Sequence, residues 1–364
     1  MKRSICFVIF DLNIVGGVEK VAENLANRLA DNYIVHIVSL HGTTVNPALR
    51  FEKSISITHF NLSQERLRRQ MFSGSYLLYK YFKKHQIEIA FLEATFAGFI
   101  GAPLGMFSKT KIVFCDHGAL YNQLDDKDIT SMRWIASHLC NYIVVLTKKS
   151  EEDYERIFHL KKKKIVSIYN SIKDTLVDDN RQYDSKSRII ITAGRFTKEK
   201  GFDLLLEVAK IVMPANPSWQ WYIYGEGPLD GMIKKKIKEY GLTDSVIMKG
   251  FTDKMEEVYE SAAMYVLPSY REGLPLVLLE AKAFKLPSIS FDIVTGPNEI
   301  IEEGINGHLI SPYDVKSMAE CINHLIQNED YRKYLSENAY SNIDKFQESI
   351  VLREWENLIT KLNS

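Results

Sequence analysis

The sequence predicts an α/β protein of two domains, each a parallel β-sheet that is covered by helices on both faces. With 364 residues, the chain is longer than one hydrophobic core usually organises. Short apolar runs that are typical of buried strands alternate with segments of helical periodicity. This alternation begins near residue 5 and begins again near residue 188, after a polar stretch with little periodicity.

The first domain is predicted to span residues 1–170. Ile5–Phe10 is a continuous apolar run, and a glycine-containing loop follows it. Val18–Ala30 has apolar residues at helical spacing, and Tyr33–Leu40 is apolar again. This order is a β-loop-α-β unit, the start of a doubly wound sheet. Further strands are expected at Ile89–Leu92, Ile112–Cys115, Ile143–Leu146 and Ile165–Tyr169, with a charged helix at Lys148–Phe158.

Residues 171–187 are polar and are predicted to link the two domains. Residues 188–345 form the predicted second domain, and the C-terminal helix, residues 346–364, is expected to complete the first. The strands of the second domain are expected at Arg188–Ala193, Trp219–Tyr224, Val246–Lys249, Met264–Pro268, Pro287–Phe291 and His308–Ile310. Its helices are expected at Gly201–Met213, Pro228–Tyr240, Lys254–Ala262, Leu276–Phe284 and Gly296–Glu303. Two such domains would place a functional crevice between them, at the carboxyl ends of their strands.

The formal net charge is zero, which argues against a dedicated nucleic-acid binder. The charge is nevertheless uneven. Residues 1–180 contain 24 Lys and Arg against 19 Asp and Glu, a net charge of +5, and the remainder carries −5. An anionic surface or acceptor is a natural partner for the basic half, although chance scatter of charge explains the same numbers.

The cysteines and the apolar segments indicate a cytoplasmic protein. None of the four cysteines, Cys6, Cys115, Cys140 and Cys321, forms a C-x-x-C pair, and free thiols suit a reducing compartment. The apolar run that follows Lys2 and Arg3 is shorter than a signal-peptide core. Residues 90–107, the best candidate for a membrane span, contain Glu93 and Pro103 and are too short.

The segment from Arg271 to Ala281 carries the strongest chemical signal. A predicted strand ends at Pro268, and a helix is expected to begin near Pro275, where proline is favoured. The free N–H groups at that helix end would suit a diphosphate. Glu272 precedes the helix, and Glu280 lies inside it, about 7.5 Å beyond Pro275 along the helix axis at 1.5 Å per residue. Carboxylates accept hydrogen bonds from sugar hydroxyls, whereas the alternative is an amphipathic helix with two solvated glutamates.

Two other strand-to-helix loops carry features of a phosphate site. Arg195 and Lys200 could neutralise a diphosphate leaving group, although solvated loop charges are the simpler explanation. Gly16 and Gly17 allow the backbone to approach a ligand closely, and a tight turn without a ligand is the alternative. The G-x-G-x-x-G dinucleotide pattern is absent from this loop.

With these motifs, the sequence resembles the large retaining glycosyltransferase group of GT-B architecture that is often called family 4. Glu272 and Glu280 match the group's E-x7-E motif, with Gly273, Leu274 and Pro275 after the first acid. The resemblance covers nearly the whole chain, and the motifs occur in the group's order. Its other parts are G-G-V-E at Gly16, the Gly194–Gly201 segment, Tyr224–Pro228, Gly250-Phe251, Val266–Ser269 and Glu303–Gly307. The group often has P-N-G-I where this chain has Tyr169–Ile172.

The resemblance implies a role for each matching residue. Arg195 and Lys200 would bind the donor diphosphate, Glu272 the donor-sugar hydroxyls, and Glu280 the ribose hydroxyls. The backbone of Gly273, Leu274 and Pro275 would lie near the sugar and the phosphate, with Gly225, Gly250 and Phe251 at the donor nucleotide. Gly16 and Gly17 would approach the donor phosphate and the acceptor. His117, in Asp116-His117-Gly118, matches a histidine near the donor sugar, although a lone histidine is more often structural. His117, Arg195, Lys200 and Glu272 are thus the predicted catalytic residues.

The resemblance further implies two Rossmann-like domains that face each other across a cleft, and transfer from a UDP-sugar with retention of configuration. The resemblance also implies front-face attack by the acceptor, with the departing phosphate helping to take its proton. No carboxylate of this sequence is obviously placed as a covalent nucleophile. We expect no metal and no cofactor, since Asp125-Asp126 and Asp178-Asp179 are typical of polar loops. Thr295-Gly296-Pro297 is typical of some members that build bacterial polysaccharide, and it points to a galactose-type or N-acetylated donor sugar.

The expected acceptor is a lipid-linked glycan of surface polysaccharide synthesis, such as capsule, exopolysaccharide or O-antigen. Residues 66–72 and 76–84 mix cations with aromatic side chains, which predicts peripheral docking on an anionic membrane. The alternative is that these aromatics pack in the core. Three other functions remain open: a nucleotide-sugar epimerase, a sugar phosphorylase, and a catalytically silent protein that binds polysaccharide or a partner glycosyltransferase. The first two would need a different catalytic set, and a silent protein would be expected to lose these acids or the basic pair.

Overall fold

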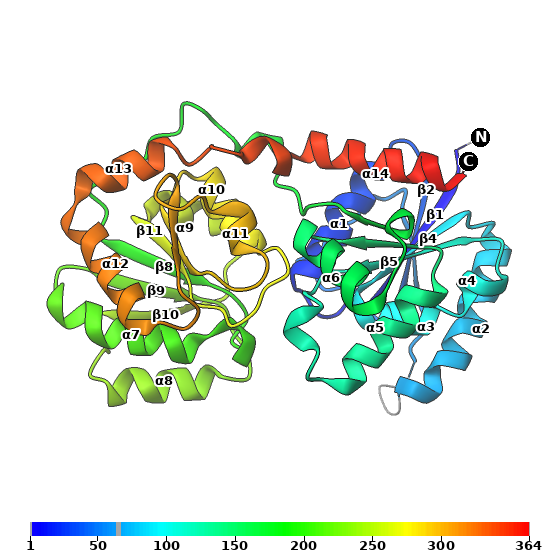
Figure 1. The fold of residues 1–364 in the computed structure, drawn as a ribbon, viewed down its shortest axis with the longest axis horizontal. Helices are drawn as coiled ribbons and strands as arrows, with labels where there is room; N and C mark the ends of the chain where they lie inside the picture. The colour runs from blue at the N-terminus through cyan, green and yellow to red at the C-terminus, as the bar shows by residue number, and fades with distance from the viewer. Residues whose placement is uncertain (1, 63–66, 364) are drawn as a thin grey trace. The chain divides into compact units, whose positions relative to one another are not determined.

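The computed structural model describes residues 2–62 and 67–363. The chain divides into two compact units (Figure 1). Unit 1 comprises Met1–Asn170 with Val351–Ser364, and unit 2 comprises Ser171–Ile350. Residues 171–187, the predicted linker, belong to unit 2, where the Tyr183 hydroxyl donates to the carbonyl of Ala263 and the Ser187 hydroxyl to that of Ser261.

Unit 1 is built on a parallel sheet of seven described strands in the order β3-β2-β1-β4-β5-β6-β7. The strands are β1 (Ser4–Asp11), β2 (Ile34–His41), β3 (Ser56–His59), β4 (Ile89–Glu93), β5 (Lys111–Asp116), β6 (Tyr142–Val145) and β7 (Ile165–Ser167). The helices are α1 (Gly17–Leu29), α2 (Leu67–His85), α3 (Ala94–Gly101), α4 (Leu104–Phe107), α5 (Lys127–Leu139) and α6 (Lys148–Phe158), with α14 (Glu348–Asn363) joining from the C-terminus.

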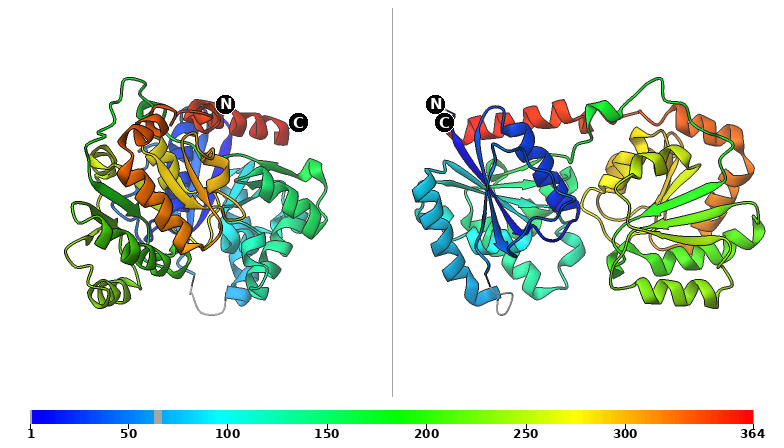
Figure 2. Two further views of the ribbon diagram at one scale, coloured as in Figure 1. Left: turned by 60° about the vertical axis from the view of Figure 1, so that its left-hand side comes forward. Right: turned by 180° about the vertical axis from the view of Figure 1, so that it is seen from behind.

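Both faces of this sheet are buried, which explains why its strands are continuously apolar. One face packs against α1 and α14, whose Trp355 ring meets Phe91 of β4 edge to face. The other face packs against α2, α3, α5 and α6. Figure 2, in the view from behind, shows α1 and α14 on one side of the sheet and α2 on the other.

Unit 2 has a parallel sheet of six described strands in the order β10-β9-β8-β11-β12-β13. The strands are β8 (Ile189–Ala193), β9 (Gln220–Tyr224), β10 (Val246–Gly250), β11 (Met264–Leu267), β12 (Ser288–Phe291) and β13 (Gly307–Ile310). The helices are α7 (Phe202–Ala215), α8 (Asp230–Glu239), α9 (Met255–Ser261), α10 (Leu276–Ala283), α11 (Pro297–Ile300), α12 (Val315–Gln327) and α13 (Glu329–Glu337). Helices α7, α8, α12 and α13 share one core with the sheet.

The predicted fold class, two α/β domains with parallel sheets, is therefore confirmed. One predicted helix is wrong in length: residues 296–303 were expected to be helical, but α11 ends at Ile300. Beyond it, Gly304 has a φ of +71° and its N–H donates to the carbonyl of Gly307. This turn leads directly into β13 and leaves no room for another helical turn.

The strand orders also locate the switch point of each sheet, where successive strands are added on opposite sides. In unit 1 it lies between β1 and β4, and in unit 2 between β8 and β11. Loops that leave the carboxyl ends of such strands diverge and open a crevice, which is where ligands bind in sheets of this type.

Candidate functional site

The loops after β8 and β11 meet at the switch point of unit 2. The Lys200 Nζ lies 2.8 Å from Oε1 and 2.9 Å from Oε2 of Glu272, so the ammonium bridges the carboxylate. The Ser269 hydroxyl donates to the same Oε1 at 2.7 Å. The Glu272 side chain is largely buried and Lys200 partly so, which means that solvent and salt screen this pair less than a surface salt bridge.

Glycines bring these loops into contact. Gly201 has a φ of +67°, and a Cβ atom there would lie 2.0 Å from the carbonyl oxygen of Pro268. Gly296 has a φ of +100°, and its Cβ would lie 2.8 Å from the carbonyl oxygen of Gly273. The adjacent Thr295 hydroxyl donates to the backbone carbonyl of Glu272 at 2.8 Å. The segment with Thr295 and Gly296 thus supports the loop that carries Glu272.

Helix α10 begins at Leu276 with Pro275 as its extended N-cap. No side chain caps this end, and the first backbone N–H to bond within the turn is that of Leu278. Inside the helix, Glu280 accepts a hydrogen bond of 2.7 Å from the hydroxyl of Tyr259 in α9. Tyr259 is fully buried, so it fixes the direction of the Glu280 carboxylate.

The other predicted residues of unit 2 lie on nearby loops. The Arg195 side chain is 56% exposed and lies 4.0 Å from the carboxylate of Glu199, a loose pair. Gly225 has a φ of +129°, a Cβ there would lie 2.0 Å from the carbonyl oxygen of Gly194, and its N–H donates to the carbonyl of Gly250. Phe251 is 58% exposed. Unit 2 therefore presents a cation, a carboxylate held by Lys200, and an exposed ring on loops at the carboxyl ends of its strands.

In unit 1, Gly16 is the N-cap of α1 and Gly17 is the first residue of that helix. The Glu19 carboxylate is close: a Cβ atom on Gly16 would lie 3.1 Å from Oε2 of Glu19. The third predicted residue of this unit, His117, directly follows β5.

His117 forms a short hydrogen bond with Glu93, a residue that was not predicted as part of the site. Nε2 of His117 lies 2.5 Å from Oε2 of Glu93, and the two side chains are 9% and 3% exposed. Burial alone disfavours the imidazolium, but the hydrogen bond and the charge of Glu93 outweigh it. Asp116 and Glu19 add to the effect, and the pKa of His117 is raised above its ordinary value.

The backbone around this pair is unusual. Ala94, directly after Glu93, has a φ of +66°. A left-handed conformation costs an ordinary residue about 1–2 kcal/mol, so the surrounding structure must hold it. The Asp116 carboxylate is also held in place. It accepts a hydrogen bond of 2.6 Å from the Tyr154 hydroxyl and lies 3.1 Å from Nε of Arg133. Tyr154 and Arg133 are both buried.

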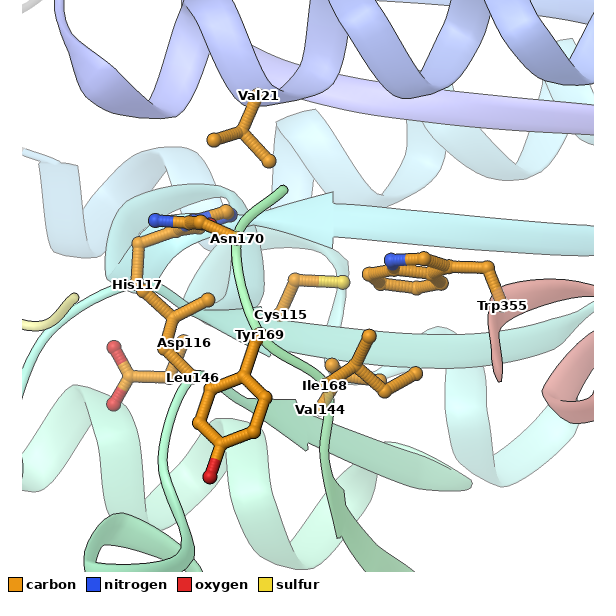
Figure 3. Close-up of a pocket in the computed structure, with 10 residues that line it drawn as sticks. All are labelled: Val21, Cys115, Asp116, His117, Val144, Leu146, Ile168, Tyr169, Asn170 and Trp355. Carbon is orange, nitrogen blue, oxygen red and sulfur yellow. The ribbon is translucent and has the colours of Figure 1, made fainter. Parts of the chain in front are cut away.

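A small pocket opens beside His117 (Figure 3). Its wall includes Val21 of α1, Asn170, and Trp355 of α14. Figure 3 shows the Cys115 Sγ pointing toward the Trp355 ring, with the His117 ring beneath Val21. Burial raises the pKa of the Cys115 thiol, so this cysteine is an apolar wall residue and not a thiolate.

The amphipathic segment of unit 1 is divided between core and surface. Leu78, Tyr81 and Phe82 of α2 are buried in the core. Phe72 and Tyr76 of the same helix are 74% and 57% exposed, and Lys80 lies over the Tyr76 ring. Met106 and Phe107 of α4 are 71% and 64% exposed, and the Phe107 ring contacts that of Tyr79. We call the exposed set Phe72, Tyr76, Lys80, Met106 and Phe107 the α2–α4 patch.

Arg66 lies outside the described residues, and so do the side chains of Arg68 and Arg69. Within residues 2–62 and 67–363, no helix is long and apolar enough to cross a bilayer. The same residues contain no group of three His, Cys, Asp or Glu arranged to hold a metal ion.

The comparisons with known proteins agree with the geometry. Residues 175–342 match the family described as "Glycosyl transferases group 1", and residues 15–176 match "Glycosyltransferase Family 4". An uncharacterized glycosyltransferase of Haemophilus influenzae is 27% identical over 359 residues, which cover 98% of this chain and all of that protein. A Campylobacter jejuni α-1,4-N-acetyl-D-galactosaminyltransferase is 26% identical over 99% of both chains, and its name gives an acceptor linked to undecaprenol.

Among solved structures, TarM of Staphylococcus aureus in complex with fondaparinux, α-GlcNAc-glycerol and UDP superposes with a TM-score of 0.82. The match covers all of both chains at 17% identity, so it shows the shared fold. The predicted resemblance is confirmed by these matches.

Proposed function

Because this chain belongs to the family 4 glycosyltransferases of GT-B architecture, we propose that it transfers a hexose or N-acetylhexosamine from a UDP-sugar to a lipid-linked glycan, with retention of anomeric configuration. The proposed role is the synthesis of a surface polysaccharide or glycoconjugate. The observation that carries the proposal is the Lys200–Glu272 pair at the switch point of unit 2, beside the uncapped start of α10.

This geometry suits a UDP-sugar. A diphosphate would accept hydrogen bonds from the free N–H groups at the start of α10 and would attract Lys200 and Arg195. Glu272 would accept hydrogen bonds from sugar hydroxyls, and Glu280, held by Tyr259, from the ribose. The UDP that is bound in the TarM complex supports the choice of nucleotide.

The proposed reaction breaks the bond between the anomeric carbon and the phosphate oxygen. An acceptor hydroxyl forms the new bond on the same face, and the leaving diphosphate takes its proton. Lys200, Arg195 and the start of α10 stabilise the charge that grows on the phosphate. Glu272 is bound by Lys200 and Ser269, which suits a residue that positions the sugar better than a covalent nucleophile.

We further propose that the reaction needs neither a metal nor a cofactor, since Arg195 and Lys200 supply the positive charge. Incubation with EDTA should leave UDP release unchanged. A complete loss of activity that Mn²⁺ or Mg²⁺ restores would contradict this part of the proposal.

The central test is turnover of UDP-sugars by the purified chain, read as UDP release with a lipid-linked acceptor. Retention is checked by the NMR coupling constant of the new anomeric proton. Arg195→Ala should depress the transfer rate more than it depresses UDP affinity, because charge on the phosphate grows in the transition state. Lys198→Ala, an exposed cation in the same loop, is the matched control and should change neither. A chain that binds UDP but releases none from any UDP-sugar would favour the catalytically silent alternative.

We propose that unit 1 binds the acceptor and docks on the cytoplasmic face of an anionic membrane through the α2–α4 patch. Exposed aromatics beside Lys80, Lys83 and Lys84 suit an interface where rings enter the headgroup zone and lysines meet anionic lipid. Each such cation contributes about 1 kcal/mol near the surface. The lipid-linked acceptor named for the Campylobacter relative supports this choice of partner.

Vesicle co-sedimentation tests the docking. The wild-type chain should pellet with anionic vesicles, and less so at high salt. Lys80→Glu with Lys83→Glu and Lys84→Glu should remain in the supernatant. The control variant reverses the same number of exposed lysines elsewhere in unit 1, Lys161, Lys162 and Lys163, and should pellet like the wild type. Equal pelleting of both variants would refute docking through α2 and leave the donor-site proposal intact.

A further inference from the structure

We propose that Glu93 is a positioning residue for sugar transfer: it fixes the ring of His117 through Nε2, so that the Nδ1–H of the imidazolium is offered to a hydroxyl of the sugar substrate. This inference rests on the proposed function, in which His117 lies at the donor sugar. It goes beyond that function because it assigns a role to Glu93, which lies 24 positions before His117 in the sequence.

The sheet places the two residues together. Strands β4 and β5 are neighbours, and Glu93 is paired in register with Cys115, two residues before His117. Both side chains therefore leave the same carboxyl edge of the sheet, where ligands bind in folds of this type. The pair is not a surface salt bridge, because both side chains are at least nine-tenths buried.

The geometry leaves one ring nitrogen for a ligand. Nε2 is engaged by Glu93, and within the described residues the His117 ring makes no other hydrogen bond. A carboxylate accepts only, so Nε2 must carry a proton, and Nδ1 becomes a donor when the ring is charged. The His117 side chain keeps 9% of its surface exposed, and the residue lines the pocket of Figure 3.

The charged groups around the ring all favour the imidazolium. Glu93 of β4 is in contact, Asp116 of β5 is adjacent in sequence, and Glu19 comes from α1. Their combined effect raises the pKa of His117 despite burial, which extends the charged form toward neutral pH. Asp116 is already bound by Arg133 and Tyr154, which leaves Glu93 as the direct partner of the ring.

The backbone gives independent support. Ala94 holds a φ of +66°, a conformation that alanine rarely adopts, at the point where β4 passes directly into α3. Retained strain of this kind clusters at functional sites. Here it lets the chain turn immediately after Glu93, which stays at the end of its strand.

An NMR pH titration of the histidine ring signals tests the pairing directly, with His117→Asn used to assign the signal. The wild-type His117 pKa should lie above 6.5, and Glu93→Gln should lower it. Glu93→Asp, which keeps the charge, should restore most of the shift. Ala94→Gly is the matched neighbour control: it relieves the backbone and should leave the pKa unchanged. A wild-type pKa at or below 6.5 would overturn the proposal even if Glu93→Gln does not fold.

Transfer kinetics test the role. Glu93→Gln should reduce kcat/KM for transfer about 10-fold or more at pH 8, a size typical of a lost charged hydrogen bond. The loss should be smaller at a second pH, chosen below the His117 pKa that the NMR titration gives for the variant, because the ring then regains its proton. UDP affinity, which depends on unit 2, should not change. An equal loss at both pH values would assign Glu93 a purely structural role. Absence of turnover in the wild type would refute the proposed function, while the titration would still decide the Glu93–His117 pairing.

Discussion

Lys200 and Glu272 are 72 residues apart in sequence, yet the Lys200 ammonium bridges both carboxylate oxygens of Glu272, at 2.8 and 2.9 Å. The proposed function assigns the two residues to different parts of the donor, the diphosphate and the sugar. On this assignment, donor binding would draw Lys200 at least partly away from Glu272, which holds the ammonium in the structure described here.

This relationship predicts opposite effects on binding and on transfer. Glu272→Gln should raise UDP affinity several-fold, because Lys200 no longer leaves a carboxylate to meet the diphosphate. The same variant should lower transfer by about 10-fold or more, since the proposed role of Glu272 is to form charged hydrogen bonds with the sugar. Calorimetry with UDP and the UDP-release assay measure the two effects. Glu239→Gln, which changes an exposed acid at the end of α8 in the same unit, is the control. Unchanged UDP affinity in Glu272→Gln would show that the ion pair does not oppose binding.

The Tyr259–Glu280 hydrogen bond predicts a graded loss of nucleotide affinity. Glu280→Ala should weaken UDP and UDP-sugar alike, by about 1.5–3 kcal/mol for a charged contact. Tyr259→Phe keeps the carboxylate and removes only the hydroxyl that orients it, so a loss of about 1 kcal/mol is expected. Calorimetry of both variants with UDP checks the order. If Tyr259→Phe weakens UDP as much as Glu280→Ala does, the tyrosine contributes more than orientation.

The sequence predicted the fold class and the loops of the candidate site because both depend on local patterns. Apolar runs gave the strands, and the E-x7-E and Arg195–Lys200 segments lie after β11 and β8, as their patterns indicated. The roles assigned to these residues stay predictions. The contact of Lys200 with Glu272 depends on β8 and β11 being neighbours in the sheet. Local sequence patterns do not predict the order of strands in a sheet.

Glu93 was overlooked for the same reason. The only local signal of Glu93 is that its carboxylate interrupts the apolar segment 90–107. On sequence alone, that segment is the best candidate for a membrane span. The structure resolves residues 90–107 into the end of β4 and two short helices, α3 and α4. The pairing of β4 with β5 brings Glu93 to His117, and the left-handed turn at Ala94 has no sequence signal, since alanine favours ordinary helical backbone.

Lys282 predicts a pH-dependent stability. Its side chain is 4% exposed, and no hydrogen-bond partner for Nζ is found in the described part of the chain. Burial lowers the pKa of Lys282 to about 7, although Glu302 partly opposes this. Between pH 7 and the ordinary value of 10.5, the unfolded chain binds the proton and the folded chain does not. The free energy of unfolding must therefore rise with pH in that window, by at most about 1.4 kcal/mol per pH unit from this group.

Lys282→Met removes this contribution and replaces the lysine with an unbranched apolar side chain that is one atom shorter. Urea unfolding at pH 7, 8 and 9 should show the wild type gaining stability relative to the variant as the pH rises. Taking the difference cancels the other groups that titrate in this range. Parallel curves for the two proteins would mean that Lys282 is charged in the folded state and has a partner there.

Gly201 and Gly241 form a matched pair that tests how the unit 2 loops are held together. Both have a φ of +67°, so alanine suffers the same backbone penalty at either position, about 1–2 kcal/mol. They differ in surroundings: a Cβ on Gly241 would meet nothing within 4 Å, whereas one on Gly201 would lie 2.0 Å from the Pro268 carbonyl oxygen. Gly201→Ala must therefore push the loop that carries Lys200 away from the loop that carries Ser269 and Glu272. It should cost a further ~1–3 kcal/mol from overpacking.

Thermal unfolding of unit 2 should show a larger loss of stability for Gly201→Ala than for Gly241→Ala. UDP affinity should fall only in Gly201→Ala, because the displaced loop carries Lys200 away from the start of α10, where the diphosphate is proposed to bind. Equal losses of stability and affinity in both variants would mean that the loops yield without cost and that their contact does not shape the site.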